Sequence, residues 1–186
     1  MRKLLALAAL AVLPILSGCF ALAVGGVGTA ALMADDRRTA GIYVEDENIE
    51  WKALARLHEK YQGAHVNTTS YNRKVLLTGE VPNEDVKKQI GEEVRRIPSV
   101  ADVHNELQVA GASSLAGRGN DAVITTTVKG RMLNNGKFSP NHVKVVTEAG
   151  TVFLMGLVSQ AEGEAAVEIT RTTQGASRVV KVFEYR

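Results

Sequence analysis

The alternation of apolar and polar positions occurs twice along this chain in the same order. Two 44-residue stretches, 66–109 and 143–186, align without a gap at a spacing of 77 positions. The first contains the run V-L-L-T-G-E-V and the second V-F-L-M-G-L-V, so that Gly79 falls on Gly156. A matched glycine inside a matched alternation indicates a duplication, and we therefore predict two domains of one fold.

Each copy predicts a hairpin followed by a helix. Period-two alternation on both sides of a short polar turn, at 72–73 and at 148–150, is typical of two antiparallel strands. Apolar residues then recur at near-helical spacing. Asn83 is placed to cap the first of these helices, and Ser159 with a glutamate three positions later has the spacing of a capping box.

A third strand and a preceding helix complete each copy. Pro98 and Gly175 stop the capped helices, and apolar alternation resumes after each of them. One more helix is predicted before each hairpin, at 49–61 and at 121–133. The order α-β-β-α-β predicts an α+β fold, with a small three-stranded sheet covered on one face by two helices in each domain.

The N-terminus has the pattern of a bacterial lipoprotein signal. Arg2 and Lys3 precede an apolar run of signal-peptide length, which is too short to span a bilayer. The run ends in Leu-Ser-Gly followed by Cys19, the only cysteine of the chain. We predict that residues 1–18 are removed and that Cys19 carries the lipid anchor. The alternative is a general secretory signal with a buried cysteine.

Residues 19–45 predict a flexible tether between this anchor and the first domain. Their Gly26-Val-Gly-Thr-Ala-Ala sequence matches a dinucleotide-binding fingerprint in its letters, but no strand can precede it. We therefore expect no cofactor here. The predicted organisation is a signal peptide at 1–18, a tether at 19–45, a first domain at 46–110, a linker at 111–119 and a second domain at 120–186.

Charge argues against a general nucleic-acid binder. The chain has 22 basic and 20 acidic side chains, and removal of the signal peptide takes away Arg2 and Lys3, which leaves 20 of each. Residues 46–109 carry a net charge of −2 and residues 120–186 a net charge of +2. The second domain is therefore the one suited to an anionic surface.

The repeated motif resembles the BON domain family. The motif V-x-L-x-G-x-V is followed by a polar cap, a helix and the motif V-x-x-V-x-N-x-L. In the first copy, residues 75–81 carry the first motif and residues 100–107 carry the second, with Asn105 at the asparagine position. A lipobox followed by two such domains resembles the two-BON-domain outer-membrane lipoproteins. The resemblance implies phospholipid binding, envelope integrity, a place at the division site and no enzymatic activity. The second copy departs from the motif, since Lys181 replaces the asparagine.

Candidate lipid-binding residues lie in the second domain. Weak contacts suffice there, because a lipid anchor would hold the domain at a high local concentration near the bilayer. The candidates are one apolar side chain that is predicted to be exposed and four cations: Val123, Lys129, Arg131, Lys137 and Arg171. The alternative is an ordinary solvated face, with Ile124 and Val128 forming the core stripe of the helix.

Signs of catalysis or metal binding are weak. The four histidines (His58, His65, His104 and His142) lack the paired spacing of a metal site, and no serine lies in a nucleophile elbow. Asp46, Glu47 and Glu50 are interpreted as the acidic first turn of a helix. The two repeat glycines predict a structural role, either a bulge or the close approach of a covering helix.

These observations predict a non-enzymatic lipoprotein that is anchored in the outer membrane and faces the periplasm. Its expected partner is anionic phospholipid, bound through the second domain, and nucleic acid is not expected. The alternative is a periplasmic adaptor that docks on the outer-membrane assembly machinery, and an envelope hydrolase is the remaining hypothesis.

Overall fold

The computed structural model describes residues 35–186, and Arg37–Arg186 form one compact unit. The predicted signal peptide, Cys19 and most of the predicted tether lie outside the described residues. Within 35–186, no helix combines the length and the apolar character needed to cross a bilayer.

The first half of the unit has the predicted element order. It starts with a long helix, α4, and continues through a hairpin, a second helix and a third strand: α4 (Ala40–Lys60), β1 (His65–Tyr71), β2 (Lys74–Val81), α5 (Glu84–Arg95), β3 (Asp102–Asn105) and β4 (Gln108–Val109). Strand β2 is central, antiparallel to β1 and parallel to β3 and β4.

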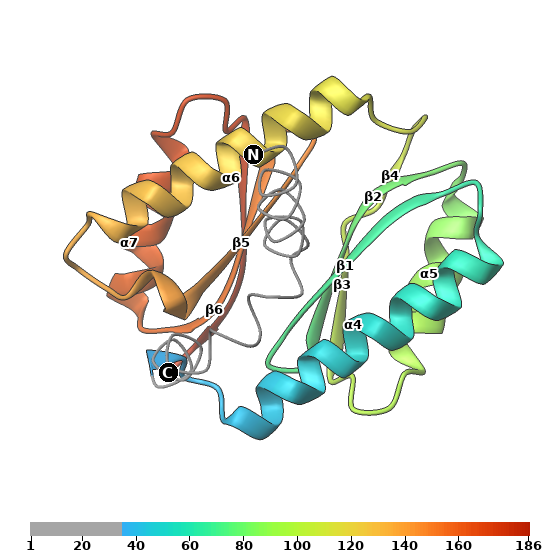
Figure 1. Ribbon diagram of the computed structural model, residues 1–186, viewed down its shortest axis with the longest axis horizontal. Helices are drawn as coiled ribbons and strands as arrows, with labels where there is room; N and C mark the ends of the chain where they lie inside the picture. Colours follow the sequence, from blue (N-terminus) through green and yellow to red (C-terminus); the bar gives the residue numbers. More distant parts are fainter. Residues whose placement is uncertain (1–34) are drawn as a thin grey trace, which may run out of the picture. The chain divides into compact units, whose positions relative to one another are not determined.

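The second half repeats this order with one short 3₁₀ turn added. Its elements are α6 (Leu115–Leu133), η2 (Pro140–His142), β5 (Val143–Glu148), β6 (Thr151–Val158), α7 (Gln160–Arg171) and β7 (Arg178–Tyr185). Strand β6 is central, antiparallel to β5 and parallel to β7. In each half, two helices lie on one face of the sheet (Figure 1). The predicted α+β fold with two helix-covered sheets is confirmed.

Local sequence signals explain the hairpins and the helix starts. The turn at Asn72-Arg73 has positive φ at both residues (52° and 64°), which suits the twist of a two-residue hairpin. The side chain of Asn83 accepts a hydrogen bond from the N–H of Val86, and Ser159 forms the predicted capping box with Glu162. These predicted caps are confirmed.

The third strand differs between the halves. In the second half β7 is continuous, whereas in the first half the strand is divided into β3 and β4. Asn105 lies at the division, where its side-chain amide donates to the carbonyl of Lys87 at 2.8 Å and its side-chain oxygen accepts from the N–H of Leu107 at 3.3 Å. The motif asparagine thus ties the end of β3 to helix α5.

Helices α4 and α6 both begin earlier than predicted. Helix α4 starts at Ala40 with Thr39 as its cap, and α6 starts at Leu115 with Ser114 as its cap. The C-terminal part of the predicted tether and of the predicted linker is therefore helical. The interpretation of Asp46, Glu47 and Glu50 as a first helical turn is also wrong, because they lie in the middle of α4.

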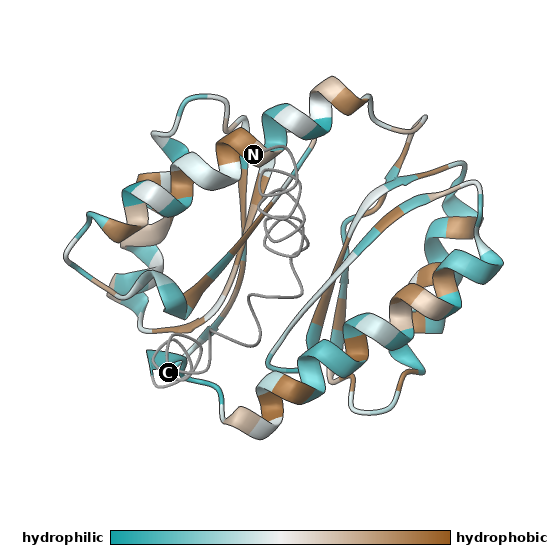
Figure 2. Ribbon diagram, in the orientation of Figure 1, coloured by the Kyte–Doolittle hydropathy of each residue, from teal (hydrophilic) through white to brown (hydrophobic). Residues whose placement is uncertain are grey.

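Each half has a core between its sheet and its helices. In the first half, Ile49 and Leu57 of α4 and Ile90 and Val94 of α5 pack on the inward residues of β2. In the second half, Ile124, Val128 and Met132 of α6 pack with Ala166 of α7 on β6. Figure 2 shows apolar residues along the strands of both sheets.

The opposite faces of the two central strands are also buried. Tyr71 and Leu76 of the first half form one apolar cluster with Phe153, Met155 and Val182 of the second. Strand β6 is therefore apolar at consecutive positions, because one set of alternating side chains packs on the helices and the other packs on the first half. We call this second cluster the interdomain core.

The repeat glycines lie where a strand passes close to another backbone. A Cβ on Gly79 would be 2.0 Å from the carbonyl oxygen of His65, and one on Gly156 would be 2.3 Å from that of His142. Gly79 also has a φ of 113°, in the region that favours glycine. The close neighbour is backbone and not a covering helix: His65 is the first residue of β1, and His142 directly precedes β5.

Candidate functional site

Helix α6 presents two different faces. Its buried face consists of Ile124, Val128, Met132 and the carboxylate of Asp121. Its outward face carries three aliphatic side chains, Leu115, Val123 and Leu133, which are 87%, 64% and 69% exposed. Asp121 is the only acidic residue of α6, so the outward face carries no negative side chain.

Val123 and Lys129 both lie on this exposed side of α6. Lys129 is exposed, and no ion pair of its ammonium group is present among residues 35–186. Lys137 is also exposed, in the loop that follows α6. Ile124 and Val128 are buried, so these two residues form the core stripe of the helix. Val123 is exposed. The outward face of α6, with Lys129, is called the α6 surface below.

Arg131 is engaged inside the second domain. One guanidinium nitrogen donates to the carbonyl oxygen of Ile169 at 2.7 Å and to the hydroxyl of Thr173 at 2.6 Å, and the other donates to the hydroxyl of Thr172 at 3.0 Å. These acceptors lie at the C-terminal end of α7, where a cation also complements the helix dipole. Because its guanidinium is already engaged by these three acceptors, the candidate Arg131 is left out of the α6 surface.

Arg171 also has a partner on its own helix. Its side chain forms an exposed ion pair with Glu168, three residues earlier on α7. The charge that it offers to an anionic surface is partly balanced by this carboxylate. Of the four cations expected from the sequence, Lys129 and Lys137 are thus the two whose side chains have neither an ion pair nor a hydrogen bond among the described residues.

The two leucines of the α6 surface are not among the candidates predicted from the sequence. Leu115 lies in the predicted linker, and Leu133 is the last residue of the predicted helix. A signal was nevertheless available, because neither leucine fits the buried stripe through Ile124, Val128 and Met132.

A second exposed apolar surface lies on the first domain. Trp51, the only tryptophan of the chain, is 67% exposed on α4, with Leu54 next to it. Both line a hollow of about 710 Å³ together with Tyr61 and with Val66 of β1. Because β1 is an edge strand, its outward backbone groups border this hollow.

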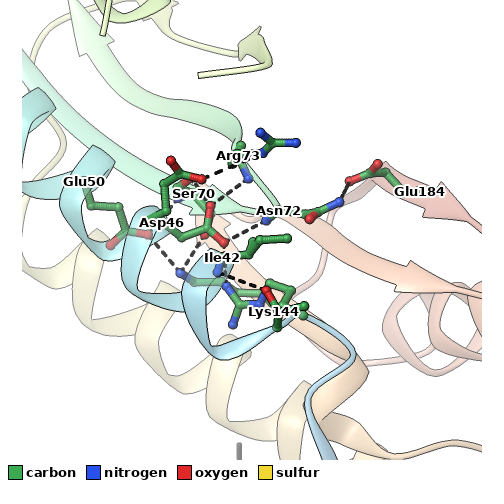
Figure 3. A network of polar contacts seen from close by, with 11 residues as sticks. Ile42, Asp46, Glu50, Ser70, Asn72, Arg73, Lys144 and Glu184 are labelled. Atoms are coloured by element: carbon green, nitrogen blue, oxygen red, sulfur yellow. Dashed lines mark hydrogen bonds and ion pairs between the residues drawn. The ribbon is translucent and has the colours of Figure 1, made fainter. Parts of the chain in front are cut away.

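Polar contacts join the two domains beside the interdomain core. The ammonium group of Lys144 lies 2.9 Å from a carboxylate oxygen of Glu50 and also donates to the carbonyl oxygen of Ser70. Glu184 accepts from the side-chain amide of Asn72 at 2.9 Å. Figure 3 shows Lys144 and Glu184 from the second domain around the hairpin end of the first.

The segment before α4 contacts both domains. Arg37 forms a bidentate ion pair with Glu162 of α7, with both N–O distances at 2.7 Å. This guanidinium, aided by the capping hydrogen bonds with Ser159, lowers the pKa of Glu162 to about 2 against the effect of burial. Arg38 pairs with Asp46 at 2.8 Å. The folded unit therefore begins at Arg37, inside the predicted tether.

The BON domain model matches this chain twice, over residues 45–111 and 120–186. These two ranges are the two halves described above. The chain belongs to the BON family. The resemblance inferred from the glycine motif and from Asn105 is confirmed.

Named relatives extend this result to a type of BON protein. The chain is 39% identical over 173 residues to the outer membrane lipoprotein DolP of Haemophilus influenzae, which covers 91% of this chain and 90% of the relative. It is 33% identical to a 21 kDa hemolysin of Actinobacillus pleuropneumoniae (81% and 79% covered) and 27% identical to the osmotically-inducible protein Y of Escherichia coli (75% and 72%). The chain is a DolP-like, two-BON-domain lipoprotein of the outer membrane.

Proposed function

We propose that this BON protein binds anionic phospholipid through the α6 surface of its second domain, as a non-enzymatic, lipid-anchored protein that faces the periplasm. The observation that carries the proposal is the composition of the α6 surface, with three exposed aliphatic side chains, one free lysine and no acid. A helix face of this kind inserts shallowly at the boundary between headgroups and acyl chains. Envelope integrity and a role at the division site follow from the family resemblance.

The energetics of this surface require an anchor. Each basic side chain near an anionic leaflet contributes on the order of 1 kcal/mol, so that Lys129 and Lys137 alone give only weak attraction. Cys19, 18 residues before Arg37, would supply the missing proximity through its acyl chains. Anchoring converts a weak surface contact into one that is occupied most of the time.

Co-sedimentation with vesicles tests the proposal. A fragment of residues 35–186 keeps Arg37 and Arg38, and it removes the anchor that would otherwise dominate binding. It is expected to sediment with vesicles containing phosphatidylglycerol and not with neutral phosphatidylcholine vesicles. Val123→Asp and Lys129→Glu should each reduce the bound fraction several-fold.

A matched charge reversal controls for net charge. Lys88→Glu, at an exposed position of α5 in the first domain, changes the charge by the same amount and should leave binding unchanged. Equal loss in Lys88→Glu and Lys129→Glu, or full binding of Val123→Asp, would contradict the assignment to α6.

The exposed Trp51 favours one alternative, a protein adaptor that docks through the first domain. The hollow beside it offers aromatic and aliphatic walls and a free strand edge, which suit an extended segment of a partner protein. A photocrosslinking residue at position 51 or at position 123 would separate the two functions in cells. A dominant protein adduct from position 51, together with no vesicle binding, would support the adaptor and contradict the lipid proposal.

A further inference from the structure

Three side chains that can bind a metal ion meet where the two domains join. His65 and Glu80 face each other as a cross-strand pair of β1 and β2, and Glu148 ends β5 of the second domain. One ligand atom from each lies within 4.8 Å of the other two. Spacing along the sequence could not reveal this group, because the third ligand comes from the other domain.

The local charge is unbalanced. Glu80 and Glu148 are 6% and 5% exposed, so water screens their mutual repulsion poorly. His65 Nδ1 lies 2.9 Å from Glu80, and within 35–186 no cationic side chain lies within ion-pair distance of Glu148. A cation bound between these two buried carboxylates would offset their repulsion.

Neighbouring groups orient the carboxylates as the outer shell of a metal site would. The side-chain amide of Asn67 donates to Oε2 of Glu148 at 2.8 Å, and the backbone N–H of Ser113 donates to Oε2 of Glu80 at 3.2 Å. The Oε1 atom of each carboxylate accepts no hydrogen bond from the described residues. Hydrogen bonds to one oxygen of a ligating carboxylate fix its orientation and leave the other oxygen for the metal.

A route to solvent exists on one side of the group. A hollow of about 420 Å³ is lined by His65, Asn67, Thr147 and Glu148, together with residues of α6. It leaves room for an ion to enter and for water to complete the coordination.

We propose that His65, Glu80 and Glu148 bind one divalent transition-metal ion, with zinc as the first choice. One imidazole nitrogen, two carboxylate oxygens and a water are a donor set that zinc accepts in tetrahedral geometry. Ligand atoms around zinc lie about 2.0–2.2 Å from the ion, so small side-chain rotations would close the present spacing around it. Bound in this way, the ion links β1 and β2 of the first domain to β5 of the second.

The test uses the full chain without a histidine tag, in detergent, after treatment with EDTA. Calorimetric titration with zinc should show one site per chain. Glu148→Gln and His65→Gln should each weaken zinc affinity by more than about tenfold. His104→Gln is the matched control, because His104 lies 3.4 Å from Asp102 in an exposed pair elsewhere on the first domain, and it should keep the site.

Two measurements make the result independent of how well the variants fold. Zinc at about 100-fold above its dissociation constant should raise the melting midpoint of the unaltered chain by roughly 5–10 °C. Cobalt(II) in place of zinc should give the visible absorption of a four-coordinate site. Equal zinc binding by Glu148→Gln and the unaltered chain, or a melting midpoint of the unaltered chain that does not respond to zinc, would overturn the proposal.

Discussion

Asp46 and Asp121 hold the hairpin turns of their domains in the same way. Asp46 accepts from the backbone N–H groups of Asn72-Arg73 at 2.8 and 2.7 Å, and Asp121 accepts from those of Ala149-Gly150 at 2.9 and 2.8 Å. Both carboxylates are buried in the middle of a helix. Helix α4 in the first domain and helix α6 in the second are thus each hydrogen-bonded to the hairpin turn of their own sheet. Figure 3 shows this contact in the first domain.

Replacing either aspartate by alanine should destabilise its domain. The two turn N–H groups would lose their acceptor, at a cost of about 2–4 kcal/mol in the free energy of unfolding. Asp46→Ala should cost more than Asp121→Ala, because Asp46 also accepts from the hydroxyl of Ser70 at 2.6 Å and pairs with Arg38. Urea denaturation followed by circular dichroism measures both variants.

Asp85→Ala is the control for this comparison, since Asp85 is exposed in the first turn of α5. Its substitution should change the free energy of unfolding by less than about 1 kcal/mol. A loss in Asp46→Ala no larger than that in Asp85→Ala would show that the turn contact is unimportant.

Local signals explain what could be predicted from the sequence. The strands that contain Gly79 and Gly156, the turn at Asn72-Arg73 and the cap at Asn83 each depend on a few neighbouring residues, and all are present in the structure. The early starts of α4 and α6 were missed although Thr39 and Ser114 are ordinary caps. Small residues around them are typical of linkers, and that composition concealed the caps.

Contacts between distant residues explain what could not be predicted. The burial of Asp46 depends on a turn 26 residues later, and the acceptors of Arg131 lie about 40 residues later, in the last turn of α7 and just after it. The interdomain core did leave a signal, since Phe153 and Met155 make β6 apolar at consecutive positions. A strand with one solvated face would alternate there, so the run indicates burial on both faces.

Alanine at either repeat glycine should destabilise the protein by about 2–4 kcal/mol. In Gly79→Ala and Gly156→Ala the new methyl group would meet a backbone carbonyl oxygen, that of His65 or of His142, and backbone cannot move aside as a side chain can. Gly119→Ala is the control, because nothing lies within 4 Å of its Cβ position in α6, and it should stabilise the helix by about 0.5–1 kcal/mol. Thermal unfolding compares the three variants, and wild-type stability in Gly156→Ala would contradict the steric explanation.

Acid should weaken the contact between Arg37 and α7. The pKa of Glu162 is lowered to about 2 in the folded protein, chiefly by Arg37, so its ion pair stabilises the fold above the ordinary glutamate value of 4.5. This contribution, no more than about 3 kcal/mol, should disappear as the pH falls from 4.5 towards 2. Melting midpoints between pH 6 and pH 3 should therefore fall less steeply for Glu162→Gln than for the unaltered chain. Glu164→Gln, exposed on the same helix, should retain the steep dependence.

Arg131 and Lys129 should respond differently to substitution, although both were expected to bind lipid. Arg131→Ala removes three hydrogen bonds to the end of α7 and should cost about 1–3 kcal/mol of stability. Lys129→Ala should leave the free energy of unfolding within about 0.5 kcal/mol, because its side chain is exposed. Urea denaturation measures the free energy of unfolding of the two variants. Equal values would show that the hydrogen bonds of Arg131 contribute little to stability, and Arg131 would then be a lipid-binding candidate like Lys129.

The interdomain core should protect the first domain from local opening. Phe153 is fully buried against Tyr71 and Leu76, so Phe153→Ala uncovers a face of the first domain although the substitution lies in the second. Hydrogen exchange measured by mass spectrometry should therefore accelerate in peptides covering 65–81. Met132→Ala is the matched control, because it removes a buried side chain of the second domain from the core between α6 and its sheet, away from this interface. Exchange at 65–81 should rise more in Phe153→Ala than in Met132→Ala, since only the former removes contacts with those strands. Equal exchange in the two variants would mean that the first domain senses only the overall stability of the second and not the packing of Phe153.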